Sequence, residues 1–198
     1  DGFLPHEFVG SATITDNPED LAVKITQALN LQKDWNKNNS AAFNVLREAV
    51  SNLGILVMQN GVVGNNNHRI LNVAEFRAFV LIDEYVPLIF LNARDSTNAK
   101  IFSLCHELVH IWLGVDELYN DNFATNQIFN NGKLESFCNE VAAEMLLPLS
   151  SIQSTLDRQH DIYTNIKQIS KVFNVSESLV RIRLKAKQIN NAKLLHED

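Results

Sequence analysis

Apolar residues between positions 17 and 52 recur every three to four positions, a spacing that predicts amphipathic helices. Asn17 suits the N-cap of the first helix, because its side chain can accept a backbone hydrogen bond, and Pro18 suits the first helical position. Ser40 suits the N-cap of the second helix. The predicted helices are 17–32 and 41–52, and the polar segment 33–40 between them is a predicted loop.

Shorter apolar runs bounded by turn residues follow, and these predict strands. The predicted strands are 55–59, 75–83 and 88–92. The segment NGVVGNNN (60–67) consists largely of turn residues and predicts a loop.

The pattern then becomes helical. Asp95 to Thr97 offers N-caps for a helix that Gly114 ends, and residues 134–147 are strong helix formers followed by Pro148. After about residue 150 the chain predicts helices only. A few short strands that do not alternate with helices as β-α-β units predict the α+β class, with a short antiparallel or mixed sheet and a helical C-terminal extension.

The composition narrows the class of protein. The 198 residues suit one domain, no apolar run reaches about 18 residues, and the N-terminus has no signal-peptide pattern, so we expect no membrane span. Cys105 and Cys138 are too few for a disulfide framework, and we expect buried, reduced thiols in a cytoplasmic protein; the alternative is that one binds a metal. The chain begins without Met, so we expect that a preceding segment is missing.

The charge is unevenly distributed. Residues 158–198 contain eight Lys and Arg against four acidic residues, a net charge of +4, whereas the whole chain carries −6 and the remainder therefore −10. Residues 166–187 have a helix–turn–helix pattern, with a helix ending near Phe173, a turn at Asn174 and a second helix capped by Ser176. The basic residues of the second helix are Arg181, Arg183, Lys185 and Lys187. These helices either cover the domain with a solvated basic side, or dock a repressor or contact DNA phosphates.

The helix that Gly114 ends is almost wholly apolar, yet it contains His106, Glu107 and His110 in an H-E-x-x-H pattern. Positions i and i+4 share one face of a helix, so the two imidazoles lie side by side. This spacing suits two ligands of a tetrahedral Zn²⁺, and Glu107 is placed to act as general base on a zinc-bound water. The alternative, two core histidines with an incidental Glu, would bury costly polar groups.

A catalytic zinc needs a third protein ligand and an open position for water. Asp116 has the spacing of one known pattern, but that pattern needs Gly at position 113, where this chain has Leu. Glu135, which lies 25 residues past His110 at the start of the next helix, is the better candidate. Asn139, four residues later, is placed to accept a hydrogen bond from a ligand histidine; the alternative is a solvent-facing or capping amide. Two histidines and one carboxylate suit one Zn²⁺ per chain, and another divalent ion is the alternative that the sequence leaves open.

Other polar residues leave alternatives open. Glu144 lies in an apolar run of the same helix and has either a buried hydrogen-bonding role or an ordinary surface position. The sequence does not choose the oxyanion-stabilising group among His160, Tyr163 and Tyr119.

Three segments together resemble the ImmA/IrrE family of zinc metallopeptidases in order and spacing. These segments are EFRAFVLIDEYVPLIFLN, IFSLCHELVHIWLG and ESFCNEVAAEMLLP. The chain departs from the family at Phe137 and Cys138, where many relatives have Glu-Ala. The resemblance implies a zincin-like domain whose sheet packs on the H-E-x-x-H helix. It also implies zinc ligands and a catalytic carboxylate, namely His106, His110 and Glu135 with Glu107.

The same resemblance implies a protein substrate. Family members are small bacterial enzymes, often on phages and mobile elements, that typically cleave a transcriptional repressor, and many carry a DNA-binding module. We therefore expect a zinc endopeptidase in residues 1–155, with 1–40 as a helical lead-in, and a basic helical segment in 156–198. The expected partner is a helix–turn–helix repressor, bound in part by addition to a strand edge near LIFLN. The alternative is a weakly active or inactive peptidase fold that binds a repressor, or less favourably DNA, through its C-terminal helices.

Overall fold

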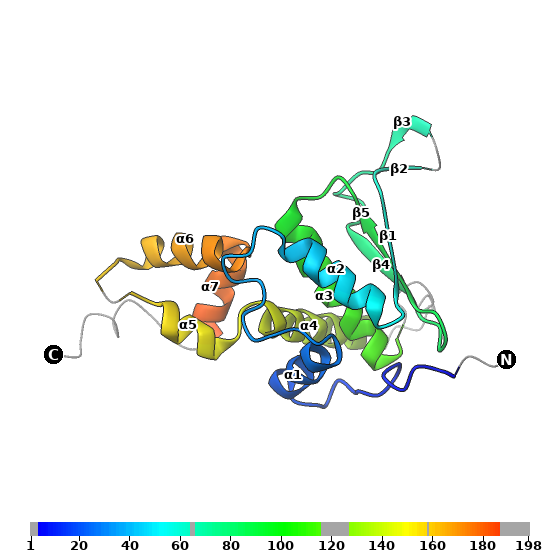
Figure 1. The fold of residues 1–198 in the computed structure, drawn as a ribbon, viewed down its shortest axis with the longest axis horizontal. Helices are drawn as coiled ribbons and strands as arrows, with labels where there is room; N and C mark the ends of the chain where they lie inside the picture. The colour runs from blue at the N-terminus through cyan, green and yellow to red at the C-terminus, as the bar shows by residue number, and fades with distance from the viewer. Residues whose placement is uncertain (1–3, 64–65, 116–126, 158, 187–198) are drawn as a thin grey trace.

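The computed structural model describes residues 4–63, 66–115, 127–157 and 159–186 (Figure 1). The helices are α1 (Pro18–Ala28), α2 (Ala42–Asn52), α3 (Thr97–Leu113), α4 (Gln127–Leu146), α5 (Leu149–Thr155), α6 (Ile162–Phe173) and α7 (Glu177–Ala186). The strands are β1 (Leu56–Asn60), β2 (Val62–Val63), β3 (Asn66–Ile70), β4 (Ala78–Leu81) and β5 (Leu88–Asn92). Figure 1 shows the strands at one end of the molecule and α5 to α7 at the other, with α3 and α4 between them. The predicted α+β class is confirmed.

The main sheet has three strands in the order β1–β5–β4. The central strand β5 pairs parallel with β1 and antiparallel with β4, so the sheet is mixed. Ile89 and Leu91 of β5 are fully buried on the face that packs on α3, whereas Leu88 and Phe90 point to the opposite face and are partly exposed. The sheet therefore packs on the H-E-x-x-H helix, as predicted.

The predicted loop at 60–67 was wrong in part, because this region contains a two-stranded antiparallel sheet. Val62 of β2 pairs with Ile70 of β3, and the register shifts between Val62 and Val63. Both partners are β-branched, which favours extended backbone. The many Gly and Asn residues around them hid this short strand pair.

Both ends of α3 follow the sequence. The Ser96 hydroxyl accepts a hydrogen bond from the Ala99 N–H at 3.3 Å, and Gly114 ends the helix with a φ of +66°. A Cβ on Gly114 would approach Gly10 Cα to 2.9 Å, so glycine also permits the close packing of the N-terminal segment here. The N–H groups of Gly10 and Ala12 donate to the α3 carbonyls of Ile111 and Trp112, and the His6 N–H donates to the Glu84 carbonyl.

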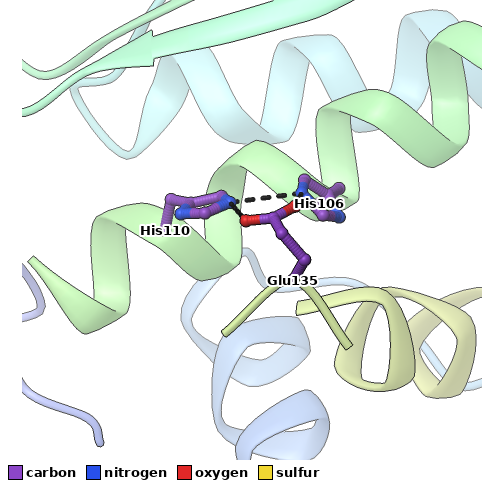
Figure 2. Close-up of side chains that lie close together, drawn as sticks. All are labelled: His106, His110 and Glu135. Atoms are coloured by element: carbon purple, nitrogen blue, oxygen red, sulfur yellow. Dashed lines mark hydrogen bonds and ion pairs between the residues drawn. The ribbon is translucent and has the colours of Figure 1, made fainter. Parts of the chain in front are cut away.

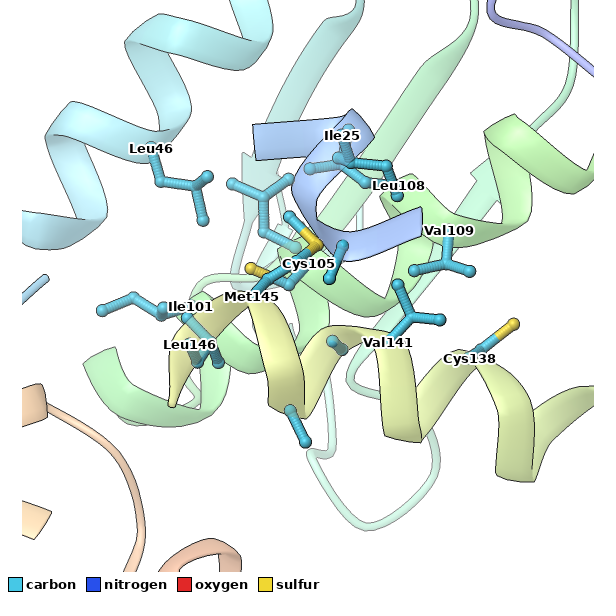
Figure 3. Close-up of a cluster of buried hydrophobic side chains, with 14 of the residues drawn as sticks. Ile25, Leu46, Ile101, Cys105, Leu108, Val109, Cys138, Val141, Met145 and Leu146 are labelled. Atoms are coloured by element: carbon cyan, nitrogen blue, oxygen red, sulfur yellow. The ribbon is translucent and has the colours of Figure 1, made fainter. Parts of the chain in front are cut away.

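The core lies where α1, α2 and α4 surround α3 (Figure 3). Cys105 of α3 and Cys138 of α4 are both fully buried there as thiols, as expected. Helix α4 begins seven residues before the predicted start at 134, because the poor helix formers Asn130, Asn131 and Gly132 hid its first turns. Among the described residues, no helix has the length and apolar character needed to cross a membrane.

The segment 33–40, predicted as a polar loop, is partly buried. Trp35 and Asn36 are at least nine-tenths buried. The Asn36 side-chain amide donates to the carbonyls of Leu146 at 2.9 Å and Phe173 at 2.6 Å. The segment therefore links the end of α4 to the end of α6. Its polar composition did not indicate this structural role.

The turn between α6 and α7 has the predicted form. Helix α6 ends at Phe173, Asn174 adopts a left-handed φ of +55°, and the Ser176 hydroxyl accepts a hydrogen bond from the Leu179 N–H at 3.1 Å. The Asn174 amide donates to the carbonyls of Asn36 and Asn39. These bonds hold the turn against the 33–40 segment.

Candidate metal centre

Two neighbouring helices contribute the three candidate metal ligands. His106 and His110 are one turn apart on α3, and Glu135 projects from α4; Figure 2 shows their polar ends converging. The spacing of four residues gives the imidazoles a common face, and the packing of α4 on α3 brings the carboxylate to the same point. Among the described residues, this is the cluster of His, Cys, Asp and Glu side chains whose ligand atoms lie close enough to hold a metal ion.

The distances fit a tetrahedral zinc site. The Nε2 atoms of His106 and His110 are 3.2 Å apart, and they lie 3.1 Å and 3.4 Å from the two oxygens of Glu135. A Zn²⁺ with bonds of about 2.0–2.1 Å would hold three tetrahedral donor atoms about 3.3 Å apart. The donor set and its spacing therefore suit this ion with little rearrangement.

The three side chains differ in burial. His110 is fully buried, the His106 side chain is 13% exposed and the Glu135 side chain is 33% exposed. The site is therefore enclosed at His110 and open to solvent at Glu135. A catalytic metal site needs such an opening for water and substrate.

The other predicted site residues differ in how exposed their side chains are and in whether the structure describes them. Glu107 is 5% exposed and follows His106 on α3. Asn139 lies one turn beyond Glu135 with an exposed side chain, and its predicted hydrogen bond to a ligand histidine stays a prediction. Asp116, the alternative third ligand, lies outside the described residues, as does Tyr119.

Cys105 is not suited to bind a metal. It precedes His106 in sequence but points into the core, and burial raises the pKa of its thiol above the ordinary range. Since a metal binds the thiolate, this environment disfavours Cys105 as a ligand.

Glu144 has the buried role that the sequence left open. It forms an ion pair with Arg183 of α7, and both side chains are nearly buried. Glu144 also accepts a hydrogen bond from the Leu149 N–H, and Arg183 donates to the Leu147 carbonyl at 3.2 Å. Burial lowers the pKa of the Arg183 guanidinium below its ordinary value. The expectation that Arg183 belongs to a solvated basic side was therefore wrong, because its charge is neutralised within the fold.

The remaining candidates for oxyanion stabilisation have local partners. His160 pairs with Asp157 at 3.3 Å, and the exposed Tyr163 packs under the Arg181 guanidinium at 5.6 Å. Both belong to the α5–α7 end of the molecule (Figure 1). Neither contact connects them to the metal ligands.

Sequence reasoning missed Phe102, whose ring centroid lies 6.3 Å from that of His106. It precedes His106 by four residues, the same spacing as that of the two histidines. That spacing was the available signal, but an aromatic residue in an apolar helix is usually assigned to the core.

A profile of the Peptidase M78 family, described as the IrrE N-terminal-like domain, matches residues 50–185. The match covers more than half of the chain and includes the candidate ligands on both α3 and α4. This chain belongs to that family. The resemblance predicted from three sequence segments is confirmed.

Solved structures agree with this fold. A Mycobacterium tuberculosis transcriptional regulator superposes on the IrrE-like domain with a TM-score of 0.54 and 13% sequence identity. At this identity the likeness shows the fold alone. The alignment covers 85% of this chain and 46% of the regulator, so the chain spans about half the length of that protein. No curated protein sequence matches the chain.

Proposed function

We propose that this IrrE-like domain is a zinc-dependent endopeptidase that hydrolyses a peptide bond of a protein substrate. The observation that carries the proposal is the convergence of His106, His110 and Glu135 at the spacing of tetrahedral zinc ligands, with one side open to solvent. Membership of a metallopeptidase family supports it.

The residues have distinct proposed roles. A zinc ion held by the two imidazoles and the Glu135 carboxylate would polarise the substrate carbonyl and lower the pKa of a water molecule to about 7. Glu107 accepts a proton from the attacking water and passes it to the leaving amine. Burial restricts the His110 ring to one orientation, whereas His106 and Glu135 border the opening through which substrate enters.

The proposed substrate is a polypeptide in extended conformation. The LIFLN segment forms the central strand β5, which is paired on both sides, so it offers no free edge itself. Its neighbour β4 is at the edge of the sheet and packs on α3, and its outer side can form main-chain hydrogen bonds with an added strand. The sequence resemblance favours a helix–turn–helix repressor as the protein cleaved. One neighbour in fold is a transcriptional regulator, which accords with such a setting.

The first test is the metal content of purified protein. We expect about one zinc per chain in the wild type and strongly reduced zinc in His110→Ala and Glu135→Ala, because each variant removes one of three ligands. His160→Ala and Glu140→Ala are matched controls, since both residues are exposed, and they should retain the metal. A wild type that binds no zinc after reconstitution would contradict the proposal.

The second test is cleavage. Zinc-loaded protein is incubated with purified candidate helix–turn–helix repressors, and the products are analysed by mass spectrometry. Glu107→Gln should keep zinc and lose about 10²- to 10⁴-fold in rate, because it removes the proton acceptor. Equal effects of wild type and Glu107→Gln on the repressor would instead favour the alternative, a regulator that only binds.

The alternative function, binding of a repressor or DNA through the basic C-terminal helices, has less support from the structure than from the sequence. Arg183 is buried against Glu144, and Arg181 is paired with Glu177 at 3.3 Å, so two basic residues of α7 already have partners. Lys187 lies outside the described residues. The basic face that would bind a repressor or DNA is thus smaller than the sequence indicated.

A further inference from the structure

A cavity of about 540 Å³ lies between α3, α4 and α7. Its apolar lining consists of Ala99, Phe102, Leu146, Val175 and Leu179. The volume falls within the range of about 300–1,000 Å³ that is usual for ligand pockets. None of the three candidate metal ligands lines it.

The cavity lies on the same face of α3 as the two histidines. Phe102 precedes His106 by four residues and Ala99 by seven, which places both within about 40° of His106 around the helix axis. The Phe102 ring is adjacent to the His106 ring, with 6.3 Å between centroids. The floor of the cavity therefore begins beside a metal ligand.

Helix α4 leads from the metal centre to the same cavity. Leu146 follows Glu135 by eleven residues, which places it within about 20° of Glu135 around that helix. Glu135 faces His110, and Leu146 and Ala99 both line the cavity, so α3 and α4 run antiparallel. The two helices that carry the candidate metal ligands therefore also contribute to the lining of the cavity.

The rim of the cavity is polar and adjoins the edge strand. Arg77, which directly precedes β4, lines the cavity and forms an ion pair with Asp95 at 3.2 Å. The exposed Ser96, Asn98 and Ser176 and the buried Ser103 complete the polar part of the lining. An apolar lining with a few polar groups is the usual composition of a ligand pocket.

We propose that this cavity is a specificity pocket that accepts a large apolar side chain of the polypeptide substrate. The proposal rests on the proposed function. Along α3, Phe102 lies about 6 Å and Ala99 about 10 Å from His106, at about 1.5 Å per residue. An extended peptide advances about 3.3 Å per residue, so the bound side chain belongs to a residue two or three positions from the cleaved bond.

The C-terminal helices thereby select substrate. Val175, in the turn before α7, and Leu179 of α7 form one wall of the pocket, and both are nearly buried. The Glu144–Arg183 ion pair and the hydrogen bonds of Asn174 to the 33–40 segment fix this wall to the body of the domain. The α7 helix therefore acts by shaping a pocket and needs no basic surface for this purpose.

The main test variant is Ala99→Leu, which extends a side chain into the cavity while keeping a strong helix former. Its matched control is Thr97→Leu, which adds a similar side chain at an exposed position about 180° from His106 around α3. Whereas Ala99→Leu fills the cavity, Leu179→Ala enlarges it. Thermal unfolding of each variant identifies any that has lost its fold.

Binding is measured without catalysis. A displayed library of random dodecapeptides is selected on zinc-loaded Glu107→Gln protein, alone and combined with each pocket variant. We expect at least tenfold enrichment of Leu, Ile, Met or Phe at one position, and at least tenfold loss of this preference in Ala99→Leu but not in Thr97→Leu. Leu179→Ala should shift the preference towards Phe and Trp. An unchanged preference in folded Ala99→Leu, or no apolar preference at all, would overturn the proposal.

Cleavage of the same library by the wild type locates the pocket. The apolar position should lie two or three residues from the cut, and a preference confined to the residues that flank the cut would overturn this placement. If the wild type cleaves nothing while the selection still yields the Ala99-sensitive preference, the proposed function fails and the pocket stands. If the wild type cleaves the library but shows no such preference, the proposed function stands and the pocket proposal fails.

Discussion

Helix α4 carries two glutamates that meet their partners in different ways. Glu135 lies between two histidines of α3 and is 33% exposed, whereas Glu144 pairs with Arg183 of α7 and is 11% exposed. The two residues are nine positions apart and therefore on opposite sides of the helix. Glu144 has its positive charge built into the fold, while Glu135 and the two imidazoles form a group that could hold a metal ion. The comparison shows how one helix can combine a structural carboxylate with a candidate ligand carboxylate.

The largest expected effect on stability comes from breaking the structural pair. Arg183→Met leaves the Glu144 carboxylate buried without its cation, and we expect a loss of about 3–5 kcal/mol in the free energy of unfolding. Urea unfolding measures this loss. Arg181→Ala, which removes a half-exposed pair on the same helix, should cost only about 0.5 kcal/mol.

The double variant Glu144→Leu/Arg183→Met sharpens the comparison. Replacing both members of a buried pair by apolar residues is often neutral, so most of the lost stability should return. A double variant as unstable as Arg183→Met would show that the hydrogen bonds to Leu147 and Leu149, and not the charge pairing, hold this junction.

The second-largest expected effect on stability comes from removing the metal. Zinc at about 100 times its dissociation constant should stabilise the folded domain by about 2.7 kcal/mol, because it binds the assembled ligands and not the unfolded chain. Thermal unfolding with zinc and with a chelator measures the difference. Glu135→Ala should abolish it, whereas Glu144→Leu/Arg183→Met should keep it. A zinc effect that survives in Glu135→Ala would mean that another residue supplies the third ligand.

The sequence predicted the metal-binding half of this comparison better than the structural half. Helix periodicity places His106 and His110 on one face of α3, and the sequence pattern proposed Glu135 as their partner, whereas the packing of α4 on α3 brings the three side chains together. The partner of Glu144 did not follow, because Arg183 lies 39 residues away in a segment whose basic residues resemble a solvated face. Only the tertiary packing of α7 turns this one arginine inward.

The same limit applies to the 33–40 segment and to the cavity. Asn36 looked like a loop residue, yet its amide joins Leu146 and Phe173, which are distant in sequence. Phe102 and Leu179 come from helices distant in sequence, and only the fold brings both to one cavity. Local patterns determined the helices and several of their caps, including the turn at Asn174, but the predicted Ser40 cap was wrong, because the N-cap of α2 is Ala41, without a side-chain hydrogen bond. The contacts between distant helices required the three-dimensional arrangement.

The smallest expected effect distinguishes the helix caps of the two regions. Helix α6 begins at Asp161, whose carboxylate accepts hydrogen bonds from the Thr164 backbone and hydroxyl, and these bonds lower its pKa. Helix α3 begins at Ser96, which does not ionise. Because the Asp161 pKa is lower in the folded state, its stabilisation is fully present above the unfolded pKa of about 4 and is lost as pH falls through the folded value.

Two variants test this difference in metal-free protein. Asp161→Asn keeps an acceptor oxygen at the cap without the charge, so the stability difference from wild type should shrink between about pH 5 and pH 3. Ser96→Ala removes the neutral cap of α3, and its stability difference should stay constant over the same range. Urea unfolding at each pH gives both values, and NMR titration of the Asp161 carboxyl gives the folded pKa. A constant difference for Asp161→Asn would mean that the cap acts through hydrogen-bond geometry alone, and the two helices would then begin by the same mechanism.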